Sequence, residues 1–321
     1  MLAKSLVKGL LTNVPGLEPL LRQRTAGDGQ SASYAYGIWM KHLTLLWANG
    51  LRQIPDTVAE LGPGDSLGVG LAAILCGTRR YFALDVHEYT NPAAALRMLN
   101  ELVALFRRRA PRAAAGWPDF DAYLDERLFP SHILTDARLS ASLSEERIAR
   151  IRDAIASPTQ VRDGICVQYI VPWSDARVLV PGSVDLVLSH AMLQHVVDLE
   201  ATYRALGLWV KPGGLMSHQV DLQSHGSSGV WNGYRAYPES LWRMMVGKRL
   251  YFINREPPAT HIRLLQANGF AATCVFRATR ADGIGRPRLA ARWRDISDED
   301  LNCSGVYFQA RRVATSGPAS R

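Results

Sequence analysis

The chain has 321 residues, of which 47% are hydrophobic and 21% are charged, so it is long and apolar enough to bury a large core. Its formal net charge of +8 is spread along the chain and favours acidic partners, such as sugar nucleotides, anionic glycans or a membrane surface. The four cysteines lack the paired spacing of a metal knuckle or a secreted disulfide framework: Cys76, Cys166, Cys274 and Cys303. No apolar run is long enough to span a bilayer, and the first residues do not resemble a signal peptide. We therefore expect a cytoplasmic protein.

Residues 1–50 are expected to form an N-terminal helical cap, because Trp39, Leu43 and Leu46 recur at helical spacing. After residue 50, short apolar runs alternate with helical segments. The expected strands are 56–61, 80–86, 165–171, 183–189, 215–222, 272–279 and 305–312. This alternation predicts an α/β fold with a doubly wound, mostly parallel sheet. The last two strands have no strong helix between them, so one of them is expected to run antiparallel.

Two segments exceed this minimal pattern. Residues 87–164 separate the second strand from the third, far more than one crossover helix requires, and a helical insertion is expected at about 107–160. Residues 223–259 follow the fifth strand, where insertions tend to form pocket walls. The chain is thus divided into the cap, a main domain over 51–312 and a disordered tail over 313–321.

A glycine-rich turn follows the first strand in the stretch VAELGPGDSLGVG, residues 58–70. A dinucleotide site needs G-x-G-x-x-G, but counting from Gly62 the third glycine position is Leu67, which would crowd a pyrophosphate. S-adenosylmethionine instead needs bare backbone for its methionine part and a carboxylate for its ribose. The turn at Gly62 and Gly64, preceded by Glu60 and followed by Asp85 after the second strand, favours this cofactor.

Five segments in order resemble the class I S-adenosylmethionine-dependent methyltransferases across roughly residues 30–312: AELGPGDSLG, FALDV, VPWSD with GSVDLVLSHAMLQHVVDL, LWVKPGGLMSHQVDL, and LLQANGFAATCVF. SASYAYGIWMKHL and WNGYRAYPESLWRMM also resemble a bacterial subgroup described as methyltransferase-domain proteins, some of them linked to cell-surface glycan synthesis. The resemblance implies a Rossmann-like sheet of seven strands in which the seventh is antiparallel to the rest.

The resemblance also implies cofactor contacts. Gly62 and Gly64 would line the methionine end, Asp85 would hold the ribose, and Val86 would lie near the adenine. The full expected set is Glu60, Gly62, Gly64, Asp85, Val86, Gln168 and Ser189. Two positions depart from the family pattern. The third motif lacks its usual acid, for which Gln168 is a substitute, and the fourth has Gln194 where a glutamate is common.

Histidines cluster near the ends of the fourth and fifth strands, and histidine titrates near neutral pH. We expect His225 or His190 to act as a general base, with Asp221 orienting the base or binding a hydroxyl group. His218 lies inside a strand and is expected to be a core residue. The expected substrate contacts are His195, Trp231 and Tyr234. The H-x-x-D-x-x-x-H pattern is not a strong zinc spacing, so no metal is expected.

The sequence thus predicts S-adenosylmethionine-dependent methyl transfer, with a hydroxyl group of a sugar, a glycan or a related small metabolite as acceptor. A natural-product or lipid methyltransferase and a non-catalytic partner protein with the same fold are the alternatives. No nucleic-acid partner is expected, since no RNA-binding module or amino-methyltransferase motif is visible. Peripheral association with a membrane stays open, and so does the oligomeric state.

Overall fold

The computed structural model describes residues 2–14, 31–89, 91–112, 128–157, 164–249 and 252–313. Part of the expected insertion, 113–127 and 158–163, lies outside the described residues, as does nearly all of the expected disordered tail, 314–321. Among the described residues, no helix combines the length and apolar character that crossing a membrane requires.

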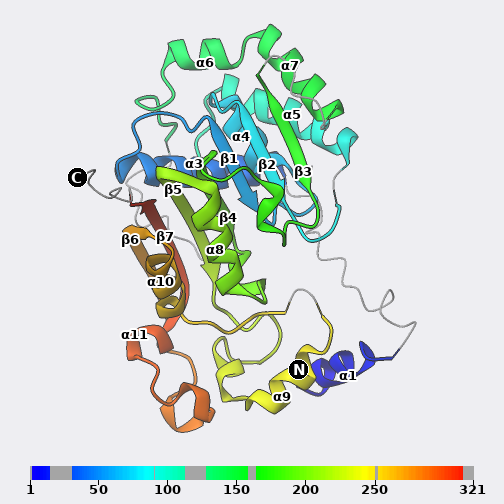
Figure 1. Ribbon diagram of the computed structural model, residues 1–321, viewed down its shortest axis with the longest axis vertical. Helices are drawn as coiled ribbons and strands as arrows, with labels where there is room; N and C mark the ends of the chain where they lie inside the picture. Colours follow the sequence, from blue (N-terminus) through cyan, green and yellow to red (C-terminus); the bar gives the residue numbers. More distant parts are fainter. Residues whose placement is uncertain are drawn as a thin grey trace, which may run out of the picture.

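The described chain forms one seven-stranded sheet with the order β3-β2-β1-β4-β5-β7-β6 (Figure 1). The strands are β1 Thr57–Leu61, β2 Arg80–Leu84, β3 Cys166–Ile170, β4 Val184–His190, β5 Val210–Asp221, β6 Phe270–Thr279 and β7 Cys303–Arg312. β1 to β5 pair in parallel, while β7 is antiparallel to both β5 and β6. The predicted Rossmann-like methyltransferase fold, including its reversed seventh strand, is therefore confirmed.

Two helical layers cover the sheet, each with its own apolar core. One core joins the sheet to α3 (Ala32–Ala48), α4 (Gly68–Leu75), α5 (Pro92–Arg107), α6 (Asp136–Ser142) and α7 (Glu145–Ala156). The other joins it to α8 (Leu199–Trp209) and α10 (Pro258–Ala267). Several of the helices begin at a residue whose side chain caps the first turn: α3 at Ser31, α5 at Asn91, α6 at Thr135, α7 at Ser144 and α8 at Asp198. At α5, the Asn91 side chain accepts from the Ala93 and Ala94 N–H groups, and Pro92 fills the first helical position.

The helices of residues 1–50 lie in two separate places. α3 belongs to the first of these two cores, the one that also contains α4 to α7, since Trp39 and Leu43 are fully buried in it. α1 (Leu2–Leu11) instead packs against α9 (Glu239–Val246), at the end of the molecule opposite α6 and α7 (Figure 1). The described part of this segment therefore does not form a single cap.

β5 begins earlier than the sequence predicted. The KPGG segment, residues 211–214, precedes the expected strand 215–222 but belongs to the start of β5, where the pairing with β4 shifts register between Val184 and Leu186. Between β6 and β7 lie short 3₁₀ turns, η5 (Arg286–Arg288) and η6 (Ala291–Trp293), and the one-turn helix α11 (Asp298–Leu301). The absence of a strong helix from this connection matches the antiparallel pairing of β6 and β7.

Candidate functional site

The glycines after β1 fall into two groups with different physical roles. Gly68 and Gly70 serve packing, because an added Cβ would collide with Ala35 and with the ring of Tyr81, respectively. Gly62 and Gly64 both have φ of +66°, a left-handed conformation that favours glycine. A Cβ at Gly62 would collide with Met192, in the loop after β4, whereas a Cβ at Gly64 would meet nothing within 4 Å. The open backbone at Gly64 is what a ligand needs to approach.

Asp85 closes one side of this turn. The Gly64 N–H donates to Asp85 Oδ2 at 3.1 Å, and the Val86 N–H donates to Oδ1 at 2.7 Å. The Tyr169 hydroxyl, from the end of β3, donates to the carbonyls of Gly64 and His87 at 3.1 Å each. Each carboxylate oxygen accepts more than one bond, so Asp85 keeps acceptor capacity for ribose hydroxyls. Tyr169 is a site residue that the sequence reasoning missed.

Glu60 lies beneath the turn and is buried, with its Oε2 accepting from the Tyr81 hydroxyl at 2.6 Å. Burial raises the pKa of Glu60 to about 7, and the nearby Asp85 carboxylate adds to the rise while the Tyr81 bond opposes it. Its carboxyl group is thus already engaged by a neighbour, and its direct contact with a cofactor ammonium remains a prediction.

Two expected cofactor residues lie within the strands of the sheet, and their contact with a cofactor remains a prediction. Gln168 pairs with Phe82 in the middle of the β2–β3 ladder, two residues before β3 ends. Ser189 is fully buried, and its hydroxyl shares a 2.8 Å hydrogen bond with His218 Nδ1. His218 is thereby a core residue with one nitrogen satisfied, as expected. Val86, by contrast, follows Asp85 and is 36% exposed, and its place near an adenine ring remains a prediction.

His190 ends β4 and lies under α3. Its ring centroid is 6.1 Å from that of Tyr34 and 6.2 Å from that of His42. Both of its ring nitrogens are buried and have no hydrogen-bond partner in the structure as described. Burial, helped by the Lys41 ammonium, lowers the pKa of His190 to about 3. A nitrogen this weakly basic and this enclosed is a poor proton acceptor.

Asp221 and His225 are brought together by the turn that ends β5. His225 Nε2 lies 3.4 Å from Asp221 Oδ2, and the Gln223 N–H donates to Asp221 Oδ1 at 2.9 Å. His225 has a φ of +44°, a strained conformation of the kind that clusters at functional sites. Burial raises the pKa of Asp221, and His225 opposes that rise. The ring of His195 lies edge-on to that of His225, with centroids 5.1 Å apart. The structure thus gathers three of the expected residues at the ends of β4 and β5.

Trp231 and Tyr234 lie inside the segment after β5. Tyr234 is buried, and its hydroxyl donates to the Leu222 carbonyl at 2.8 Å. Trp231 is also buried, under the Arg280 guanidinium, which lies 5.8 Å from the ring centroid. Both side chains pack this segment, so their expected contact with substrate requires movement.

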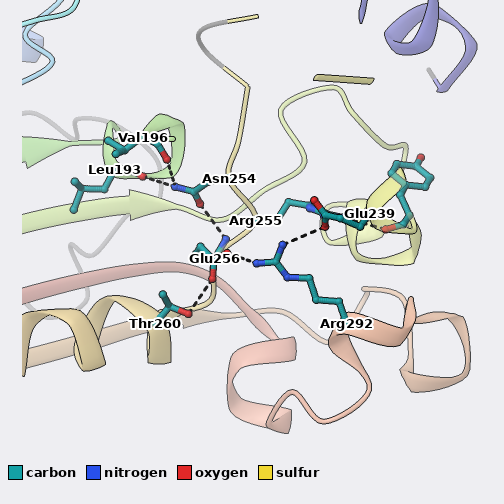
Figure 2. A network of polar contacts seen from close by, with 9 residues as sticks. Leu193, Val196, Glu239, Asn254, Arg255, Glu256, Thr260 and Arg292 are labelled. Atoms are coloured by element: carbon teal, nitrogen blue, oxygen red, sulfur yellow. Dashed lines mark hydrogen bonds and ion pairs between the residues drawn. The ribbon is translucent and has the colours of Figure 1, made fainter. Parts of the chain in front are cut away.

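Asn254 fixes the turn that carries His195 (Figure 2). No sequence motif indicates this role of Asn254. Its side-chain Nδ2 donates to the carbonyls of Leu193 and Val196 at 2.8 and 2.9 Å, and its backbone N–H donates to the Gln194 carbonyl at 2.7 Å. The three contacts surround η3 (Leu193–His195). The His195 turn is therefore fixed by a residue from the far end of the segment after β5.

A charged network continues from Asn254 (Figure 2). The Glu256 N–H donates to Asn254 Oδ1 at 3.0 Å, and Glu256 accepts from Thr260 and pairs with Arg292. Arg255, with its side chain almost fully buried, pairs with Glu239 and lies 4.3 Å from the Trp242 ring centroid. Of this network, Asn254, Glu256, Thr260 and Arg292 line a groove of about 600 Å³ together with Val196 to Glu200, the residues that follow His195.

No group of three or more potential metal ligands gathers anywhere in the described ranges. No protein-family model matches the chain, and no curated protein matches it either. Among solved structures, it is similar to a putative S-adenosylmethionine dependent methyltransferase from Listeria monocytogenes at 15% identity, over 87% of this chain and 99% of that one, with a TM-score of 0.42.

A second similar structure is the S-adenosylmethionine dependent methyltransferase from Mesorhizobium loti, at 20% identity over 84% of this chain and 96% of that one, with a TM-score of 0.42. A third is a putative sarcosine dimethylglycine methyltransferase from Galdieria sulphuraria, at 13% identity over 86% and 85%, with a TM-score of 0.44. These likenesses are distant, and the assignment of the fold rests on the strand order itself.

Proposed function

We propose that this protein transfers a methyl group from S-adenosylmethionine to a hydroxyl group of a sugar, a glycan or a related small metabolite. The observation that carries the proposal is the pairing of a left-handed, open backbone at Gly64 with Asp85 at the end of the neighbouring strand. The sheet around them has the seven strands, with an antiparallel β7, that the sequence resemblance to class I methyltransferases implies.

The residues present fit this cofactor. Gly64 offers bare backbone with free space above it, and Asp85 keeps acceptor capacity for a diol. Val86 and Val171, both 36% exposed after β2 and β3, offer an apolar surface for an adenine ring. When bound, S-adenosylmethionine would supply a methyl group activated by a positively charged sulfur. The protein's own part is then to align the acceptor, exclude water and remove a proton.

The His225–Asp221 pair is the best candidate for proton removal. In the tautomer with the proton on Nε2, facing Asp221, the imidazole lone pair is on Nδ1 and can accept the hydroxyl proton. Asp221 orients the ring and stabilises the imidazolium that forms. His195, in ring contact with His225, would bound the acceptor side of the site. A base of this kind contributes roughly 10²–10⁴-fold in rate for a weakly acidic hydroxyl.

The acceptor class is supported by the same geometry. An amine or thiol needs less help from a base, so an ordered histidine–carboxylate pair favours an alcohol. Natural products and lipids that carry hydroxyl groups would satisfy the same chemistry and are the alternative acceptors. A half-exposed histidine–carboxylate pair argues against a non-catalytic partner protein.

Calorimetry tests the cofactor first. We expect S-adenosylmethionine to bind and NAD not to bind, because Leu67 occupies the third position of the dinucleotide pattern. A screen of sugars, nucleotide sugars, glycans and lipids with a labelled methyl donor then tests the acceptor. Binding of NAD in place of S-adenosylmethionine would refute the proposed cofactor and, with it, the proposed methyl transfer. Transfer only to amines would keep the reaction but refute the acceptor class.

A further inference from the structure

The outward face of α1 carries an apolar row that the fold does not use. Ala3, Val7 and Leu10 recur at intervals of four and three residues, which places them on one side of the helix, and Val14 follows in the turn after it. Val7, Leu10 and Val14 are 55%, 54% and 44% exposed. Ser5 and Gly9, on the opposite side of α1, are buried. The outer side of the helix therefore presents apolar side chains to solvent, while Leu6 packs toward α9.

Exposed apolar side chains concentrate here. Of the twelve large apolar side chains exposed in the described part of the chain, five lie on α1, just after it, or on the adjoining α9: Leu2, Val7, Leu10, Val14 and Met244. Single exposed apolar residues are ordinary, but a cluster on two adjoining elements marks an interaction surface.

Positive charge borders this surface. Lys4 and Lys8 lie on the flank of α1, one turn apart, and residues 2–14 contain no aspartate or glutamate. Arg243 and Lys248, on α9 and just after it, add two exposed cations. An apolar row edged by long cationic side chains matches a bilayer surface, in which the row enters the acyl boundary and the ammonium groups meet anionic headgroups.

The inner side of α1 fixes the helix in place. A Cβ at Gly9 would collide with the Met244 carbonyl oxygen, so the backbones of α1 and α9 touch directly. The Lys248 N–H donates to Thr12 Oγ1 at 2.8 Å, and the Arg249 guanidinium donates to the Ser5 carbonyl at 3.2 Å. The apolar row therefore stands on a helix that is already anchored, and it needs no refolding to meet a surface.

We propose that α1 docks the protein reversibly onto an anionic lipid bilayer. α9 follows the carboxyl end of β5, where Asp221 and His225 lie, so docking through α1 sets the candidate site's end of the molecule toward the membrane (Figure 1). One short helix gives weak, reversible binding, and the overall charge of +8 adds a long-range attraction. The proposal does not depend on methyl transfer.

Co-sedimentation with vesicles of phosphatidylcholine, with and without phosphatidylglycerol, tests this docking. We expect the intact chain to bind the anionic vesicles and the double variant Val7→Glu/Leu10→Glu to bind at least about 10-fold more weakly. Leu208→Glu is the matched control, since Leu208 is 48% exposed on a helix elsewhere, and it should bind like the unaltered protein. Lys4→Glu/Lys8→Glu should weaken binding to anionic vesicles as well.

Several results would overturn the proposal. One is failure of the unaltered chain to bind vesicles of either composition. Another is an equal loss of binding in Leu208→Glu, which would indicate unspecific attraction. A third is a concentration-dependent dimer, seen by light scattering, that Val7→Glu/Leu10→Glu disperses, because the row would then cover a second copy. Thermal melting and calorimetry with S-adenosylmethionine, both expected to be unchanged in the double variant, keep this test separate from the proposed function.

Discussion

The carboxyl ends of β1 and β2 are fixed mainly by residues of one strand–turn–helix–strand unit, whereas the carboxyl ends of β4 and β5 are held by residues far apart in the chain. At the first, the Gly64 and Val86 N–H groups donate to the Asp85 carboxylate, and only Tyr169 is added from farther along the chain. At the second, the His195 turn is held by Asn254, and His225 is held by its own strained turn. A cofactor that many enzymes share can be bound by one local unit of the chain. The proposed acceptor site, by contrast, is assembled from several segments of the chain.

The two regions also differ in their buried ionisable groups. The cofactor end holds a carboxyl group whose pKa is raised, Glu60. The acceptor side and the sheet below it hold histidines whose pKa values are lowered by burial: His42, His190, His218 and His261. Glu60 and these buried histidines should therefore respond to acid with opposite signs, and Asp221, whose pKa is also raised by burial, should act in the same direction as Glu60.

Replacing the proposed base should have the largest effect. His225→Ala should lower kcat by roughly 10²–10⁴-fold while leaving the affinity for S-adenosylmethionine unchanged, because the ring belongs to the acceptor end only. Steady-state kinetics with calorimetry checks both quantities. His132→Ala, at an exposed histidine outside the site, is the matched control. An unchanged kcat in His225→Ala would remove the pair from the mechanism.

Gly64→Ala should weaken binding at the proposed cofactor site, at the carboxyl ends of β1 and β2. The left-handed φ makes alanine cost about 1 kcal/mol in stability, yet the added methyl group meets nothing in the protein itself. It would instead occupy the space above the turn, so we expect affinity for S-adenosylmethionine to fall by about 10²-fold, near 3 kcal/mol. Calorimetry and a urea melt measure the two effects. Full affinity in a folded Gly64→Ala variant would mean that the cofactor binds elsewhere.

Acid should weaken the histidine side. His218, with a pKa lowered by burial to about 3, is neutral when folded and takes up a proton on unfolding below about pH 6.5. Each such histidine lowers the unfolding free energy by up to about 1.4 kcal/mol per pH unit as the pH falls. Glu60 acts in the opposite direction, because its raised pKa makes the folded state bind a proton first, between about pH 7 and pH 4.5.

Urea titrations between about pH 7 and pH 5 check these signs. The unfolding free energy of the unaltered protein should fall as the pH falls. His218→Asn should make the unfolding free energy fall less steeply with decreasing pH, by an amount that corresponds to the uptake of about one proton. Glu60→Gln should make the same dependence steeper. If stability were the same at both ends of this range, these groups could not have the ionisation states described.

Loosening the His195 turn should give the smallest change in turnover. Asn254→Ala removes the side-chain bonds to the Leu193 and Val196 carbonyls, and we expect kcat to fall about 10-fold with stability reduced by about 1–3 kcal/mol. Thr260→Val is the control, because it removes a bond to Glu256 in the same network without touching the turn. A merely structural role would predict lost stability in both variants and an unchanged pH–rate profile in Asn254→Ala.

Much of the fold could be predicted from the sequence, because its signals are local. The strands, the turn at Gly62 and Gly64, and the acid at Asp85 follow one another within short windows. The sequence alone cannot distinguish the packing role of Gly68 and Gly70 from the turn conformation required at Gly62 and Gly64. The collisions that require glycine at positions 68 and 70 involve residues from other elements. Asn254 gave no signal, because its three acceptors lie about 60 positions away along the chain. The prediction for Gln168 and Ser189 depends on their positions in sequence motifs. The directions of their side chains depend instead on the alternation of side chains along a strand.

The segment after β5 has an apolar cluster of its own, formed by Tyr234, Trp242, Met245 and Ile253, apart from the two cores that hold the sheet. Side chains in such a satellite cluster can be exchanged without disturbing the main cores, provided that Asn254 still reaches its carbonyls. The lining of the proposed acceptor site can therefore diversify in this segment over evolutionary time while the remainder of the protein stays the same.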